Sequence, residues 1–143
     1  MNRIRETTAR AEVRAVAEQL LYTYAAAADE LDIETLTELL SEAQVNFAGR
    51  AGTGAEFVAS LFGDLFANAP RVRHLVSNVR VWEAVDTAGA ISCSATCRYT
   101  RWSYEPQPEL LSMGDYSARF IEAEGQWSFQ RFQVEPLWSA PPR

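Results

Sequence analysis

The sequence predicts an α+β fold in which three N-terminal helices pack on a strongly curved, mostly antiparallel sheet. The first observation is a change of period, because apolar residues recur every three or four positions before Pro70 and long β-rich runs follow it. The second is the order, since helices followed by a meander of strands are typical of α+β proteins. The third is size: 143 residues, 48% of them hydrophobic, supply one core and are too few for two ordinary domains. We therefore expect a single domain over residues 1–143.

Three helices are predicted in the first half. Residues 8–28 form the first helix, with one broad apolar face made of Val13, Val16, Ala17, Leu20, Leu21 and Tyr24. Thr8 lies in its loose N-terminal cap region. Asp32 is the expected N-cap of a second, shorter helix. Residues 55–68 form the third helix, which ends before Pro70.

The strands are predicted mainly in the second half. Before them, residues 44–48 indicate a short strand, and the glycine-rich residues 49–54 indicate a turn leading into the third helix. Four longer β-rich runs follow, separated by turn residues, over 73–85, 88–104, 110–124 and 126–137. Such a series predicts a curved antiparallel sheet with the helices covering one face.

Composition argues against several classes of function. The net charge of −6 and the absence of a basic stripe predict that nucleic acid is not a partner. No apolar run reaches the roughly 20 residues that span a bilayer, so we expect no membrane insertion. Residues 1–12 are charged and lack the apolar run of a signal peptide, so we expect a cytoplasmic protein. Cys93 and Cys97 are expected to be reduced core residues, and the chain's two cysteines and one histidine do not resemble a metal site.

Four residues are candidates for chemistry: Tyr24, Asp29, His74 and Arg131. Asp29 follows the first helix and can turn inward, or else serve as an ordinary helix-end carboxylate. His74 is the only histidine and begins a strand, where a satisfied structural role is the alternative. Arg131 alternates with Trp127 and Phe129, so it points inward unless the strand presents its other face. A His–Asp pair is a workable general base, and a tyrosine or arginine can polarise a carbonyl.

Motifs of other reaction types are missing. The sequence has no Gly-x-Ser-x-Gly nucleophile motif and no dinucleotide-binding fingerprint. The glycines of residues 49–54 lack the Lys-Ser/Thr of a phosphate loop. We therefore expect an enzyme that uses neither a cofactor nor a covalent nucleophile.

The order of several short motifs resembles the SnoaL-like branch of the nuclear-transport-factor-2-like superfamily. The motifs are Tyr24, Ala28-Asp29-Glu30-Leu31-Asp32, His74-Leu75-Val76-Ser77-Asn78, Gly114-Asp115-Tyr116 and Gly125-Gln126-Trp127. They extend over nearly the whole chain, and their order is more specific than any one of them. The resemblance implies a cone-shaped fold, in which a curved sheet and three helices close a deep apolar pocket.

The resemblance also implies a chemistry. Asp29 and His74 match the Asp and His of scytalone dehydratase-like and bile-acid dehydratase-like enzymes, and Tyr24 and Arg131 fall near further polar positions of the latter. This match implies proton abstraction beside a carbonyl, followed by dehydration, isomerisation or cyclisation of a polyketide, terpenoid or steroid-like molecule. The chain departs from the pattern, because a second pocket histidine is missing near Tyr99, and Phe47 occupies the position of the ketosteroid isomerase base. Guidance of a cyclisation by pocket shape alone is therefore a further alternative.

We expect an apolar substrate to contact a wall formed by Phe47, Leu61, Trp82, Tyr99, Tyr116, Phe120 and Phe129. The competing hypothesis is a non-catalytic ligand-binding or assembly module of the same fold. The orientation of Asp29 and His74 separates the two hypotheses, since a catalytic pair lines the pocket and a structural pair need not.

Family members often dimerise through the outer sheet face. The late strands carry large aromatics, Trp102, Tyr104 and Trp138, at positions expected to be exposed, so we also expect a homodimer.

Overall fold

A computed structural model describes residues 5–142; residues 1–4 of the N-terminal segment and Arg143 lie outside the described residues. Within that range the elements are β1 (Arg5–Thr8), α1 (Ala11–Asp29), α2 (Ile33–Leu40), β2 (Gln44–Phe47), β3 (Arg50–Thr53), α3 (Ala55–Phe66), β4 (Val72–Val85), β5 (Ile91–Ser103), β6 (Glu109–Ala123) and β7 (Gln126–Ser139). The strands form one sheet in the order β1-β4-β5-β6-β7-β2-β3. Neighbouring strands are antiparallel except for the parallel pair β2 and β7. The predicted fold class is confirmed.

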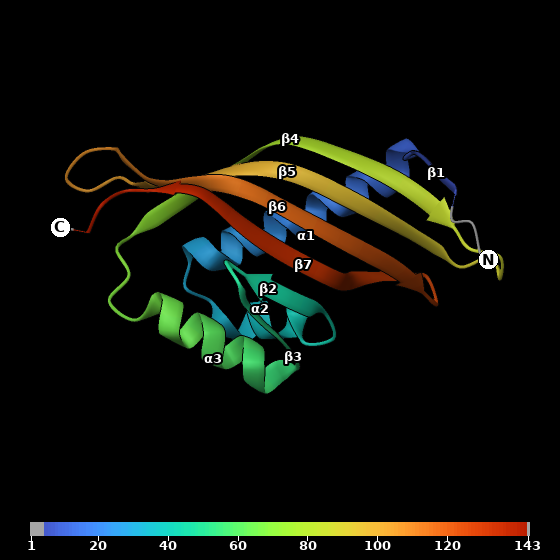
Figure 1. Cartoon of the computed structure of the whole chain (residues 1–143), viewed down its shortest axis with the longest axis horizontal. Coiled ribbons are helices and arrows are strands. Elements are labelled where there is room, and N and C mark those ends of the chain that lie inside the picture. Colours follow the sequence, from blue (N-terminus) through green and yellow to red (C-terminus); the bar gives the residue numbers. More distant parts are fainter. Residues whose placement is uncertain (1–4, 143) are drawn as a thin grey trace.

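The sheet is strongly curved and unclosed, and the helices cover its inner face. Figure 1 shows α1 crossing behind the long strands β4 to β7, while α3 and the β2–β3 hairpin lie beside β7, at one edge of the sheet. The core fills the space between α1 and the sheet, and it includes both cysteines, which are buried and unpaired. The inner space widens between α3 and the ends of β4 and β5, and this end of the cone holds the site described below.

The helices follow their apolar patterns. α1 buries one face, in which the buried residues are Val13, Ala17, Leu21, Tyr24, Ala25, Ala27 and Ala28. It begins three residues later than predicted, because Thr8 belongs to β1 and pairs with Trp82 of β4. Asp32 caps α2 as predicted, since its Oδ1 accepts a hydrogen bond from the Thr35 backbone N–H at 3.0 Å.

The glycine-rich segment after β2 is a hairpin strand and not only a turn. Ala48 and Gly49 both have positive φ, at 53° and 94°, and this two-residue turn lets β3 fold back on β2. Gly52 in β3 faces the ring of Phe57, and a Cβ at this position would collide with that ring. A strand with two small residues and only four positions has no clear alternation, so its sequence resembles a turn.

Among the register shifts of the sheet, two β-bulges change which of the predicted side chains face the core. In β4, Ser77 pairs with Arg98 and Arg80 pairs with Thr96, so β4 holds one extra residue between these pairs, near Asn78 with its φ of 55°. In β7, Gln130 is the extra residue, because positions 129 and 131 pair with consecutive residues of β6. A bulge of one residue moves every later side chain of its strand to the opposite face.

Candidate active site

A cavity of about 900 Å³ opens at the end of the cone between the C-terminal end of α1, helix α3 and the sheet. Its floor and walls come from both halves of the chain: Tyr24, Ala28, Leu31, Phe47, Phe62, Leu65, Phe66, Val72, His74, Tyr99, Arg101, Leu111, Ser112, Tyr116, Val134 and Pro136 are among the lining residues. The exposed residues Glu105, Pro141 and Pro142 line its mouth. The volume falls in the upper part of the range for small-molecule sites, roughly 300–1,000 Å³.

His74 and Asp29 are in contact at the side of this cavity. The Asp29 Oδ1 atom lies 2.7 Å from His74 Nδ1 and also accepts the His74 backbone N–H at 2.8 Å. Both side chains are only 11% exposed. His74 lines the cavity and Asp29 stands behind it, outside the lining. Because an ionised carboxylate can only accept a hydrogen bond, Nδ1 carries the proton of this contact. Nε2 of the neutral ring is then the nitrogen that can accept a proton.

The local backbone explains how Asp29 reaches the strand. Asp29 is the last residue of α1, and Leu31, with a φ of 55°, turns the chain out of the helix. A carboxylate at a helix C-terminus is disfavoured by the helix dipole, by roughly 0.3–1 kcal/mol. The two hydrogen bonds from His74, the third residue of β4, offset that cost. The Asp29 side chain therefore acts as a hydrogen-bond partner of His74 and not as a cap of α1.

The pKa of His74 lies below its ordinary value. Burial has the largest effect and lowers this pKa, the hydrogen bond and charge of Asp29 raise it, and the charge of Arg101 lowers it further. The imidazole is therefore neutral at neutral pH, which is the form that accepts a proton.

Three tyrosines line the cavity beside the pair. Tyr99 and Tyr116 stack with ring centroids 4.5 Å apart, and Tyr24 meets the Tyr116 ring edge-on at 5.4 Å. Burial raises the pKa of all three hydroxyl groups, so they are protonated hydrogen-bond donors at neutral pH. Gly114 lies opposite Tyr99, and a Cβ there would collide with that ring and with the Glu135 carbonyl. The small residue gives the tyrosine pair its room.

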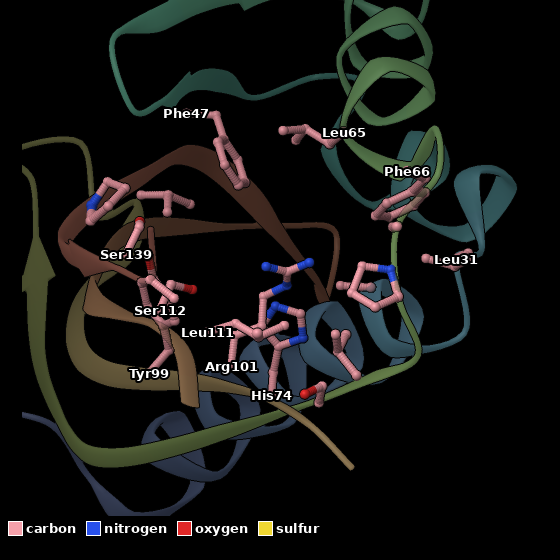
Figure 2. Close-up of a pocket in the computed structure, with 18 of the residues that line it drawn as sticks. Leu31, Phe47, Leu65, Phe66, His74, Tyr99, Arg101, Leu111, Ser112 and Ser139 are labelled. Carbon is pink, nitrogen blue, oxygen red and sulfur yellow. The ribbon is translucent and has the colours of Figure 1, made fainter. Parts of the chain in front are cut away.

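Arg101 is a cavity residue that the sequence prediction did not include. It is directly opposite His74 in the β4–β5 register and is partly buried. Figure 2 shows both side chains projecting into the cavity, with Phe47, Leu65 and Phe66 on the other side. The sequence contains a pattern that indicates the inward position of Arg101. Cys97, Tyr99 and Arg101 occupy every second position of one strand, so the two buried residues place Arg101 on the same face.

Arg131, predicted to point inward, lies on the outer face of β7 and is exposed. It borders a second, smaller hollow of about 380 Å³ beside β2 and β3, away from His74. The reason is the bulge at Gln130, which breaks the alternation with Phe129 on which the prediction depended. The inward orientation expected for Arg131 is therefore wrong.

The predicted substrate wall is partly wrong as well. Phe47, Tyr99 and Tyr116 line the cavity. Three others, Leu61, Phe120 and Phe129, are fully buried in the neighbouring core and do not line it. Trp82 is on the outer face, where the Arg80 guanidinium stacks 5.2 Å from its ring centroid, because the β4 bulge reverses the alternation before it. The sequence pattern identified large buried residues without showing which of them border the open space.

Within residues 5–142, no group of three or more His, Cys, Asp and Glu side chains is placed to hold a metal ion. No helix in the same range is long and apolar enough to cross a membrane. Among the described residues, the polar side chains that line the main cavity are the imidazole, the tyrosine hydroxyls, the guanidinium, the Asn68 amide and a few serine and glutamate side chains.

Solved structures with a similar fold include proteins of unknown function and proteins named as enzymes. A protein of unknown function with a cystatin-like fold from Nostoc punctiforme has a TM-score of 0.80 at 16% identity, covering 94% of this chain and 98% of that one. A protein from Novosphingobium aromaticivorans, provisionally named a scytalone dehydratase, has a TM-score of 0.71 at 18% identity, covering 92% and 88%. The hexachlorocyclohexane dehydrochlorinase LinA-type3 from Novosphingobium barchaimii has a TM-score of 0.70 at 13% identity, covering 92% and 94%. At these identities the likeness establishes the fold alone.

Sequence comparison establishes the family. No curated protein matches the chain in sequence. The model of the SnoaL-like domain, by contrast, matches residues 5–133, which is nearly all of the chain. The cone-shaped fold, the deep cavity and this match agree with the resemblance seen in the short motifs, and the chain belongs to the SnoaL-like domain family.

Proposed function

We propose that the protein is an acid–base enzyme that removes a proton beside the carbonyl of a small, largely apolar molecule, with dehydration, isomerisation or cyclisation as the outcome. The observation that carries this proposal is the 2.7 Å contact of His74 and Asp29 at the wall of a cavity whose lining is more apolar than polar. The name of the LinA-type3 neighbour supports it, because a dehydrochlorination also removes a proton from carbon. A polyketide, terpenoid or steroid-like substrate suits the cavity's volume and aromatic walls.

Each group has one task in the proposed mechanism. His74 Nε2 takes the proton from the carbon next to the carbonyl, the electron pair of that C–H bond forms a C=C bond with the carbonyl carbon, and the π pair of the C=O bond moves onto the oxygen. Asp29 stabilises the imidazolium that results and holds the ring in one tautomer. A hydroxyl of Tyr24, Tyr99 or Tyr116 donates a hydrogen bond to the enolate oxygen. The imidazolium then returns the proton to the departing oxygen in a dehydration or to another carbon in an isomerisation. In a cyclisation the enolate carbon bonds to a second carbonyl carbon, and the proton goes to the oxygen of that carbonyl.

The shared first step can be tested without knowing the natural substrate. The wild-type protein is incubated in D₂O with 2-tetralone and 1-decalone, and deuterium incorporation beside the carbonyl is followed by NMR. We expect exchange faster than in buffer, and a loss of about 10²- to 10⁴-fold in His74→Ala and in Asp29→Asn. The double variant should lose little more than either single variant, because the two residues act as one unit.

Arg131→Gln is the matched control, since this residue lies outside the cavity. It should exchange at the wild-type rate. Equal exchange in wild type and His74→Ala, or ketones that bind without any catalysed exchange, would refute the proposal and favour a non-catalytic binding module.

We also propose that the protein is a homodimer that uses the outer sheet face. Leu75, Thr100, Met113 and Trp138 are directly opposite one another across β4, β5, β6 and β7, so they form one row. Leu75 is 58% exposed and Trp138 44%, while Trp102 and Tyr104 are only partly exposed. Leu75, Met113 and Trp138 of this row are exposed apolar residues, and exposed apolar residues that gather on one face are typical of an interface.

A further inference from the structure

We infer that the natural ligand of the cavity is an apolar organic acid whose negatively charged oxygen binds the Arg101 guanidinium beside His74. This inference rests on the proposed function, because it places the ligand in the same cavity, and it deepens that proposal by naming the substrate class.

The position of Arg101 is set by the sheet. Arg101 pairs with His74 across β4 and β5, and residues directly opposite each other point to the same face. Both line the cavity, and Figure 2 shows the guanidinium and the imidazole projecting into it. A molecule that fills the cavity therefore borders both groups as well as Phe47 and Leu111.

No protein carboxylate forms a salt bridge with Arg101 in residues 5–142. The Asp29 carboxylate is hydrogen-bonded to His74. Burial has the largest effect on the pKa of Arg101 and lowers it, while Tyr99 and Tyr116 raise it. The carboxylates that also line the cavity, Glu105 and Glu109, are at its outer end, next to the hairpin between β5 and β6. On the inner part of the lining, Arg101 thus presents a cationic guanidinium, and the Asp29 carboxylate lies behind His74, outside the lining.

Such a cation favours a charged ligand over a neutral one. A guanidinium that has lost part of its hydration gains most from a carboxylate or another anionic oxygen, which can accept two of its N–H groups at once. The walls on the other side are apolar, so the rest of the ligand is expected to be hydrophobic. The anion also has a consequence for the base: the charge of Arg101 lowers the pKa of His74, and a bound anion opposes that effect.

The test measures equilibrium binding of acids that cannot react. Calorimetry at neutral pH compares 2-naphthoate and 9-anthroate with their amides, which have nearly the same shape and no charge. We expect the wild type to bind each acid about 10- to 100-fold more tightly than its amide. Arg101→Gln should remove this preference, and Arg101→Lys should retain part of it because it keeps the charge.

Arg98→Gln is the control, since Arg98 lies on the same strand but is exposed on the outer face, and it should keep the full preference. His74→Ala should keep it too, so failure of the base would not be confused with failure of the anion site. Two results would overturn the inference: wild-type protein that binds the acids no more tightly than the amides, including no binding of either, or an Arg101→Gln variant that retains the preference. If Arg101→Gln slowed exchange of the neutral ketones while the wild type showed no preference for acids, Arg101 would act on the reaction and not on a charged ligand.

Discussion

The substitution Asp29→Asn separates the charge of Asp29 from its geometry. His74 places two donors, its backbone N–H and Nδ1, on a single oxygen, Asp29 Oδ1. An asparagine with its carbonyl oxygen in the same place accepts both hydrogen bonds and keeps the same imidazole tautomer. Only the negative charge is lost. Asp29→Ala, by contrast, removes the acceptor and leaves both donors unpaired.

The expected cost follows from these two hydrogen bonds. A hydrogen bond to a charged group contributes roughly 1.5–3 kcal/mol and a neutral one roughly 0.5–1.5 kcal/mol, so Asp29→Asn should lower the free energy of unfolding by about 1–3 kcal/mol. Asp29→Ala should lower it by about 3–5 kcal/mol, because both side chains are only 11% exposed and water replaces the acceptor poorly. Urea unfolding measures both values.

The direct readout is the pKa of His74, which NMR can follow without assignment since it is the only histidine. The hydrogen bond and charge of Asp29 raise this pKa against the effect of burial. Asp29→Asn should therefore lower the pKa of His74 below its wild-type value, and Arg101→Gln should raise it. The exchange rate of 2-tetralone should fall with Asp29→Asn by about 10²- to 10⁴-fold.

Two outcomes would contradict this reasoning. If Asp29→Asn left both the pKa of His74 and the exchange rate unchanged, the carboxylate charge would have no part in tuning the base. If Asp29→Ala were as stable as Asp29→Asn, the two hydrogen bonds would contribute nothing to holding His74.

Three further predictions concern packing, pH and assembly. Gly114→Ala should lower the free energy of unfolding by about 1–3 kcal/mol, because its Cβ collides with Tyr99 and the neighbouring strand; Gly63→Ala, in open space within α3, is the control and should be neutral or stabilising in the same urea experiment. The pKa of His74 is lower in the folded state than in the unfolded state, so the unfolded state binds the proton first as the pH falls. The contribution of His74 to stability is therefore full above about pH 6.5 and is lost as the pH drops from there toward the folded pKa. Thermal melts of His74→Gln should lack this pH-dependent loss of stability. Trp138→Glu, on the exposed row of the outer face, should convert the proposed dimer to a monomer in light scattering, and a wild-type protein that is already monomeric at micromolar concentrations would contradict the proposed assembly.

Local physics explains what could be predicted of the fold. The helices α1 and α3 have apolar faces at helical spacing, Asp32 has the short side chain that caps a helix, and the strands after Pro70 alternate. These signals lie within a few residues of one another, so the order of helices and strands is readable from the chain. The hairpin strand β3 was missed because its small residues carry no alternation.

The candidate site depended on more than local signals. Asp29 and His74 were identifiable as residue types at promising positions, and the structure brings them together over 45 residues of sequence separation. The inward position of Arg101 was available from its alternation with Tyr99. Its place opposite His74 was not, since register depends on a pairing between two distant strands.

The sequence by itself therefore determined the fold class, the family and the identity of an Asp–His pair as the chemical candidate. Only the tertiary structure decided which large side chains border the cavity, and it moved Trp82 and Arg131 to the outer face. The physical reason is that strand side chains alternate with a period of two, so one extra residue at a bulge reverses every later position. The bulges near Asn78 and at Gln130 arise from the pairing and curvature of the whole sheet, which no short stretch of sequence encodes.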